Sequence, residues 1–217
     1  MSSGSWAAID GLLAERLLSP DPVLEAVLRR NVEACLPPID VSPLQGRFLH
    51  LLTRITHARR VLEVGTLGGY STICMARALP PEGRLVTLEL DPHHAEVARA
   101  NLAWAGVADR VEVRVGRALD LLPGVEEPID LAFIDADKAS SPAYLNWAIR
   151  LSRPAAVIVL DNVVRGGAII DPARQDENVR GVLEALRLMG ADPRLDATAL
   201  QMVGMKGHDG FAMALVI

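Results

Sequence analysis

Residues 60–72, RVLEVGTLGGYST, decide the fold of this chain. Apolar residues dominate positions 61–64, as in a buried strand, and glycines follow at 65, 68 and 69. The stretch 70–79 then continues as a helical pattern that ends before Pro80. A strand, a glycine turn and a helix in this order predict the first unit of a parallel sheet.

The same alternation continues from this unit to the C-terminus. Helical patterns over 92–106, 141–152 and 177–190 separate stretches that are typical of strands. With the first strand, the predicted strands are 60–65, 84–90, 110–116, 129–135, 155–162, 195–202 and 210–217. The last two are joined by a short turn with glycine, so we expect a hairpin in which one strand is antiparallel. The prediction is a doubly wound, mostly parallel α/β sheet with helices on both faces.

The chain before residue 59 is predicted to be a helical extension. Its apolar residues recur at three- and four-residue spacing, and Asp21 followed by Pro22 is typical of a helix start. We expect one domain over 1–217, with the extension at 1–58 and the α/β core at 59–217.

The composition argues against several classes of protein. The net charge is −5 without any block rich in Lys and Arg, which disfavours nucleic acid as a partner. No apolar run approaches about 18 residues, and the N-terminus lacks the pattern of a signal peptide, so we expect no membrane partner and a cytoplasmic protein. Cys35 and Cys74 form no CxxC motif, and we expect both to be small core residues in a reducing compartment.

The glycine loop is the first place to look for a ligand, because ligands of such sheets bind beyond the carboxyl ends of the strands. The loop is neither GxGxxG nor a GK[ST] phosphate loop, and Glu63, two residues before Gly65, would repel phosphate. Glu89 ends the next strand, where an acidic side chain accepts hydrogen bonds from ribose hydroxyls. S-adenosylmethionine, a nucleoside that carries an amino acid and no phosphate, meets these demands. The alternative is a structural turn beside an ordinary surface glutamate.

Polar residues also end two later strands. Asp135 follows the strand 129–134, and Asp161 and Asn162 end a strand 26 residues later. If these strands are neighbours, they lie roughly 4.8 Å apart and their ends can share one ion. Two carboxylates and an amide oxygen suit a hard divalent cation such as Mg²⁺, with Mn²⁺ or Ca²⁺ as other candidates.

Lys138 lies three residues after Asp135, just before a helix that begins near Ser141. A cation at this point opposes the helix dipole, so local stability does not explain it. Beside a bound dication the ammonium form is disfavoured, and the amine can take a proton from a hydroxyl. The alternatives are that Asp135 is a turn residue and Lys138 a solvated charge. Asp137 is expected to meet only water.

As a set, these motifs resemble the cation-dependent class I O-methyltransferases, which include catechol and caffeoyl-CoA O-methyltransferases. The resemblance rests on VLEVGTLGGYST, LELDP, GRALDLLP, FIDADK and LDNVVRGG, and it covers most of the chain. It implies a seven-stranded Rossmann-like methyltransferase sheet, a catechol-type phenolic acceptor and a homodimer. It implies S-adenosylmethionine contacts at Val41, Glu63, Gly65, Thr66, Ser71, Glu89, Ala118 and Asp135. It also implies metal ligation by Asp135, Asp161 and Asn162, and catalysis by Lys138 as the base together with Asp135.

The sequence leaves other functions open. One is a metal-independent methyltransferase of the same fold, in which Asp161 and Asn162 only cap a turn. Another is a protein that binds S-adenosylmethionine without catalysis, and a third, disfavoured by Glu63, is an NAD-dependent dehydrogenase. Arg165 departs from the family pattern, because relatives often carry an aromatic residue there; it either favours an acidic substrate or faces solvent.

Three aromatic residues are candidates for the walls of a phenol site. We expect them to be helix core residues rather than substrate contacts: Tyr144, Trp147 and Trp104.

Overall fold

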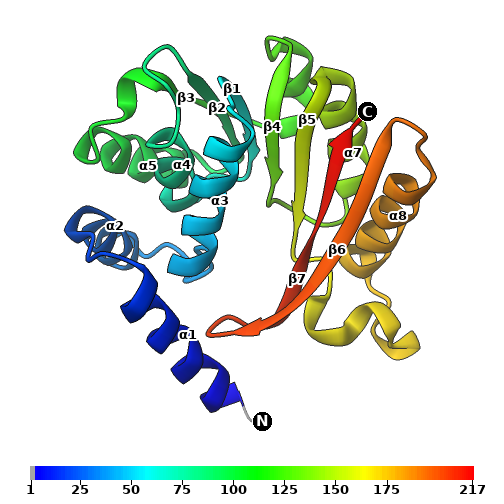
Figure 1. Cartoon of the computed structure of the whole chain (residues 1–217), viewed down its shortest axis with the longest axis horizontal. Coiled ribbons are helices and arrows are strands. Elements are labelled where there is room, and N and C mark those ends of the chain that lie inside the picture. Colours follow the sequence, from blue (N-terminus) through cyan, green and yellow to red (C-terminus); the bar gives the residue numbers. More distant parts are fainter. Residues whose placement is uncertain (1–2) are drawn as a thin grey trace. The chain divides into compact units, whose positions relative to one another are not determined.

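A computed structural model describes residues 3–217 (Figure 1). The chain divides into two compact units. Leu13–Val125 form the glycine-loop unit; Glu126–Ile217, with the described residues up to Leu12, form the hairpin unit. Helix α1 (Ser3–Leu17) spans the boundary between these ranges.

The glycine-loop unit is built on three parallel strands in the order β3-β2-β1. Their bounds are β1 (Arg60–Val64), β2 (Arg84–Glu89) and β3 (Val111–Val115). The helices are α2 (Pro22–Glu33), α3 (Pro43–Ile55), α4 (Tyr70–Ala76), α5 (Pro92–Trp104) and the short α6 (Ala118–Leu121). Two 3₁₀ turns, η1 (Ala108–Arg110) and η2 (Leu122–Gly124), complete the unit.

Local chemistry explains where these helices begin and end. The Asp21 side chain accepts a hydrogen bond from the Leu24 N–H at 3.0 Å, and Pro22 takes the first helical position of α2, as predicted. Asp91 caps α5 in the same way, through the His93 N–H at 2.7 Å. Gly106, with φ +69°, follows the end of α5 in the left-handed conformation that glycine adopts without strain.

The hairpin unit is built on four strands in the order β4-β5-β7-β6. Their bounds are β4 (Ile129–Ile134), β5 (Ser152–Asp161), β6 (Leu195–Gly204) and β7 (Gly207–Val216). The helices are α7 (Ser141–Leu151) and α8 (Glu177–Ala191), with 3₁₀ turns η3 (Arg165–Ile170) and η4 (Pro172–Arg174). β4 and β5 are parallel, whereas β7 is antiparallel to both β5 and β6.

The predicted fold class is therefore confirmed. The fold has seven strands, six parallel and β7 antiparallel, with helices on both sides and helices α1 to α3 ahead of the first strand. All six residues of β4 are buried, as expected for a parallel strand covered on both faces. The terminal hairpin is tighter than predicted, because Gly204 pairs with Gly207 and only two residues form the turn.

Two expectations about the core are wrong. Trp104 is 60% exposed, and its ring lies against the Arg30 guanidinium, 5.5 Å from the ring centroid, on the surface. Cys35 is exposed and adopts φ +60°, so it belongs to a turn after α2 rather than to a helix face. Cys74 and Tyr144 are buried as expected, and Trp147 is half-buried.

Within residues 3–217, no helix is long and apolar enough to cross a membrane.

Candidate active site

The glycine loop joins β1 to α4 through a run of unusual backbone conformations. Gly65 and Gly69 have φ +95° and +85°, a region that side chains other than glycine rarely enter. Gly68 is needed for a different reason, because a Cβ there would lie 2.1 Å from Oδ1 of Asn31. The three predicted glycines therefore make a sharp turn that closes directly onto α2.

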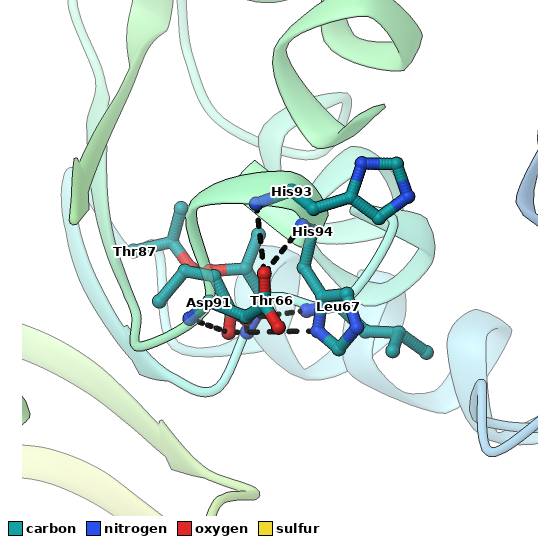
Figure 2. A network of polar contacts seen from close by, with 7 residues as sticks. Thr66, Leu67, Thr87, Asp91, His93 and His94 are labelled. Atoms are coloured by element: carbon teal, nitrogen blue, oxygen red, sulfur yellow. Dashed lines mark hydrogen bonds and ion pairs between the residues drawn. The ribbon is translucent and has the colours of Figure 1, made fainter. Parts of the chain in front are cut away.

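Glu89, at the end of β2, holds this loop in place. Figure 2 labels its surroundings, which include Thr66, Leu67 and Asp91. One carboxylate oxygen of Glu89 accepts hydrogen bonds from the backbone N–H groups of Thr66 and Leu67, at 3.0 and 2.8 Å. The other accepts from the Asp91 N–H at 2.9 Å and lies 3.7 Å from Nδ1 of His94. Because three backbone donors already occupy this buried carboxylate, it has room for few further partners.

Glu63 lies on β1 and is fully buried. Its two carboxylate oxygens accept hydrogen bonds from the hydroxyls of Ser71, at 2.6 Å, and Thr72, at 2.5 Å. Both hydroxyls come from the first turns of α4, so Glu63 ties the helix to the strand across the loop. The sequence predicted an acidic group here. The structure adds that hydrogen bonds from two hydroxyls offset the free-energy cost of burying its carboxylate.

Three further predicted cofactor residues of this unit are Thr66, Val41 and Ala118. The Thr66 hydroxyl lies 2.5 Å from that of Thr87 on β2, which fixes the loop to the sheet a second time. Val41 is buried just ahead of α3, and Ala118 is half-buried as the first residue of α6.

The acidic strand ends predicted for the metal site lie on neighbouring strands. Ile134 of β4 pairs with Leu160 of β5, so Asp135 and Asp161 are the next residues along two parallel strands. Asp161 is 2% exposed, and one of its oxygens accepts from the Asn162 N–H at 2.9 Å. Asn162 adopts φ +55°, in the left-handed region that asparagine enters more readily than most residues with a side chain.

These residues fit a hard divalent cation by their chemistry. Carboxylate and amide oxygens are its preferred ligands. Within residues 3–217, no group of three or more His, Cys, Asp or Glu is arranged to hold a metal. A site at this edge therefore depends on Asn162 as the third protein ligand beside Asp135 and Asp161.

Lys138 is buried, at 5% exposure, and is held by the loop that follows β4. Its Nζ donates a hydrogen bond to Asp135 at 2.9 Å. A solvated surface charge, the alternative considered from the sequence, is thereby excluded. The amine lies directly beside one of the proposed metal ligands.

Asp137 has a structural task in the same loop. Although it is exposed, its carboxylate accepts hydrogen bonds from the Ser140 N–H at 3.0 Å and the Tyr144 hydroxyl at 2.6 Å. Burial raises the pKa of this carboxyl, but the hydrogen bonds from Ser140 and Tyr144 outweigh it, and the pKa lies below its usual value. The expectation that Asp137 meets only water is therefore wrong.

Sequence reasoning missed the residues that hold the glycine loop and the segment after β5 in place. Asn101 of α5 donates to Oδ1 of Asn31 and to the Gly68 carbonyl, at 2.9 Å each. In the hairpin unit, Asp209 accepts from the N–H groups of Val164 and Arg165 at 3.0 and 3.1 Å. An asparagine inside a helical pattern was the one available signal; nothing local marks the others, because their partners are distant in sequence.

A glycine turn after the first strand and an acidic residue at the end of the second define the class of α/β proteins that bind nucleoside-containing ligands. Comparison with known proteins narrows this class. A family model described as O-methyltransferase matches residues 16–215. The chain therefore belongs to the O-methyltransferase family, whose members use S-adenosylmethionine as methyl donor.

Individual relatives agree with the family. The chain is 56% identical to a catechol O-methyltransferase of Mycobacterium tuberculosis, over 96% of this chain and 94% of that protein. It is 46% identical to a catechol O-methyltransferase of Niastella koreensis over the whole of both chains. The solved structure of an O-methyltransferase from Bacillus cereus in complex with SAH has a TM-score of 0.97 at 51% identity, with both chains fully covered. The predicted O-methyltransferase family, the O-methyltransferase activity and S-adenosylmethionine as methyl donor are confirmed.

Proposed function

We propose that this O-methyltransferase transfers its methyl group to a hydroxyl of a catechol-type or related phenolic small molecule, with the help of a divalent cation. The relatives named catechol O-methyltransferase, at 56% and 46% identity, support the acceptor class. The donor set Asp135, Asp161 and Asn162 supports the cation, with Mg²⁺ as the first candidate and Mn²⁺ or Ca²⁺ as others.

One observation carries the proposal: a buried lysine amine lies 2.9 Å from Asp135, at the end of a strand whose neighbour ends in Asp161. Burying a lysine costs free energy unless its charge is paired or the site has a use for it. Asp135 orients the amine, and Lys138 accepts the proton of the acceptor hydroxyl. A bound divalent cation would supply Lewis acidity that makes this hydroxyl a better proton donor.

S-adenosylmethionine supplies the methyl group on a sulfonium sulfur. We propose that the glycine loop and its surroundings hold it, through Val41, Glu63, Gly65, Thr66, Ser71, Glu89, Ala118 and Asp135. Glu89 is proposed to meet the ribose while it keeps the loop amides of Thr66 and Leu67, and Glu63 contributes negative potential near the amino group. Holding donor and acceptor in one geometry supplies much of the rate acceleration.

The test is a methyl-transfer assay with labelled S-adenosylmethionine. The acceptors are catechol and phenol, each with Mg²⁺ or with excess EDTA. We expect methylation of catechol that EDTA abolishes and added Mg²⁺ restores. Turnover that is unaffected by EDTA would assign the chain to metal-independent methyltransferases, and binding of S-adenosylmethionine without turnover would assign it a non-catalytic role.

Lys138→Ala tests the base directly. A general base contributes about 10²–10⁴-fold to the rate, so kcat should fall by that factor while S-adenosylmethionine still binds in calorimetry. Asp137→Asn is the matched control, because it disturbs the same loop without removing the amine, and it should keep most of its kcat. Near-normal turnover by Lys138→Ala would exclude Lys138 as the base.

We also propose a cytoplasmic homodimer, in keeping with the family resemblance. Apolar side chains of the edge strand β6 support the dimer, since Leu200, Met202 and Val203 are 54%, 39% and 49% exposed. Light scattering after size-exclusion chromatography measures the mass, and a monomer at micromolar concentration would refute the dimer.

A further inference from the structure

A hollow of about 800 Å³ lies in the hairpin unit, over the turns that follow β5. It is lined by η3 and η4, by the start of α8 and by the turn between β6 and β7. The function proposed above makes no use of it. Its polar lining includes Arg165, Arg174, Gln175, Lys206 and His208.

The hollow is positively charged in a chain whose net charge is −5. Three cationic side chains, those of Arg165, Arg174 and Lys206, line it against two carboxylates, those of Asp176 and Asp209. Both carboxylates are occupied by backbone donors. Asp176 accepts from the Val179 N–H at 2.8 Å, as the cap of α8, and Asp209 accepts from three N–H groups.

Among the cations that line the hollow, Arg165 has a guanidinium that is available to bind a ligand. It is half-buried, and its guanidinium has no hydrogen-bond or ion-pair partner within residues 3–217. Its backbone adopts φ +56°, and Asp209 holds it there through the Arg165 N–H at 3.1 Å. The backbone that carries this guanidinium is thus fixed, as a specificity-determining residue requires.

The hollow is also close to the proposed metal ligands along the chain. Arg165 is three residues after Asn162, so their Cα atoms are at most about 11 Å apart. A small aromatic acceptor whose hydroxyls lie near Asn162 can therefore place a substituent of its ring within reach of the Arg165 side chain.

We propose that this hollow binds a carboxylate carried by the methyl acceptor, so that the preferred substrate is an acidic catechol rather than a neutral one. The inference rests on the proposed function, which it makes more specific. Arg165 forms the primary contact, because a guanidinium pairs with a carboxylate through two parallel hydrogen bonds. Arg174 and Lys206 add positive potential around it.

The test compares 3,4-dihydroxycinnamate with its methyl ester, which keeps the catechol and removes the charge. We expect kcat/KM for the acid to exceed that for the ester by about tenfold or more, the usual effect of one charged hydrogen bond. Arg165→Gln should raise KM for the acid about tenfold and leave the ester unchanged, with a smaller effect for Arg174→Gln. Arg187→Gln removes the same charge on α8 outside the hollow and should change neither substrate.

Equal kcat/KM for acid and ester in the wild type, or a preference that survives in Arg165→Gln and Arg174→Gln, would overturn the inference. If neither compound is methylated, the proposed function fails, and calorimetric titration with the acid then tests the hollow alone. Binding of the acid that is lost in Arg165→Gln would support the hollow, and absence of binding to the wild type would refute it. Thermal melting of each variant shows that it is folded.

Discussion

Gly181 of α8 packs against the backbone of the loop that carries Lys138, and Gly181→Ala should therefore disturb that loop. A Cβ at this position would lie 2.1 Å from the Lys138 carbonyl oxygen and 2.8 Å from the Cα of Ala139. Ordinary contact begins at 3.4 Å, so the overlap with the carbonyl is 3.4 − 2.1 = 1.3 Å. Backbone atoms cannot swing aside, and either α8 or the loop must move by about that distance.

Overpacking of this kind costs about 1–3 kcal/mol. We expect the free energy of unfolding of Gly181→Ala to fall by that amount in urea denaturation followed by circular dichroism. A displacement of about 1 Å at a catalytic group can cost about 10²-fold in rate. We therefore expect kcat for catechol, at saturating S-adenosylmethionine and Mg²⁺, to fall by one to two orders of magnitude.

Gly190→Ala is the matched control on the same helix. A Cβ there meets nothing within 4 Å, and the residue is exposed. Alanine favours helix over glycine by up to about 1 kcal/mol, so this variant should be as stable as the wild type or slightly more stable, with unchanged kcat. If Gly181→Ala matched Gly190→Ala in both measurements, the close packing inferred between α8 and the Lys138 loop would be refuted.

Three further outcomes follow from contacts described above. Gly68→Ala should weaken S-adenosylmethionine binding in calorimetry and lower the melting temperature, because its Cβ overlaps Asn31; unchanged affinity would count against the tight turn. Burial raises the pKa of the Cys74 thiol to about 12, so a thiol reagent at pH 8 should label Cys35 in the native protein and both cysteines after denaturation; rapid labelling of both without denaturant would contradict this. The folded-state pKa of Asp137 is lowered, so its stabilisation is present above about pH 4 and is lost as the pH falls through the folded value. Asp137→Asn should then lower stability at pH 7 and flatten its loss below pH 4, and an identical acid profile would argue against that contribution.

Much of the fold could be predicted because its determinants are local. Alternating strand and helix patterns give the parallel strands, the terminal turn gives the antiparallel β7, and Asp21 with Pro22 gives the start of α2. The neighbouring ends at Asp135 and Asp161 were also predictable, since one crossover separates them.

What could not be predicted depends on partners far apart in sequence. Glu89 was predicted as a ribose ligand from its spacing, but its bonds to the amides of Thr66 and Leu67 arise only when β2 lies beside β1. Trp104 fits a helical core pattern by its spacing, yet it lies on the surface beside Arg30, which belongs to another helix. Local patterns identify which side chains can bind a ligand or transfer a proton. The tertiary contacts decide which hydrogen-bonding positions of those side chains are already occupied.

The contact between Gly68 and Asn31 bears on how this chain can be shortened or recombined. Asn31 donates to Asp40 at 2.9 Å and accepts from Asn101 at the same distance, so α2 forms one wall of the glycine loop. A truncation that keeps every residue from the first strand onward would still remove that wall and one of the two acceptors of the Asn101 amide, leaving it the Gly68 carbonyl. Chimeras among relatives should therefore be joined ahead of α2, so that α2 and the glycine loop come from the same parent protein.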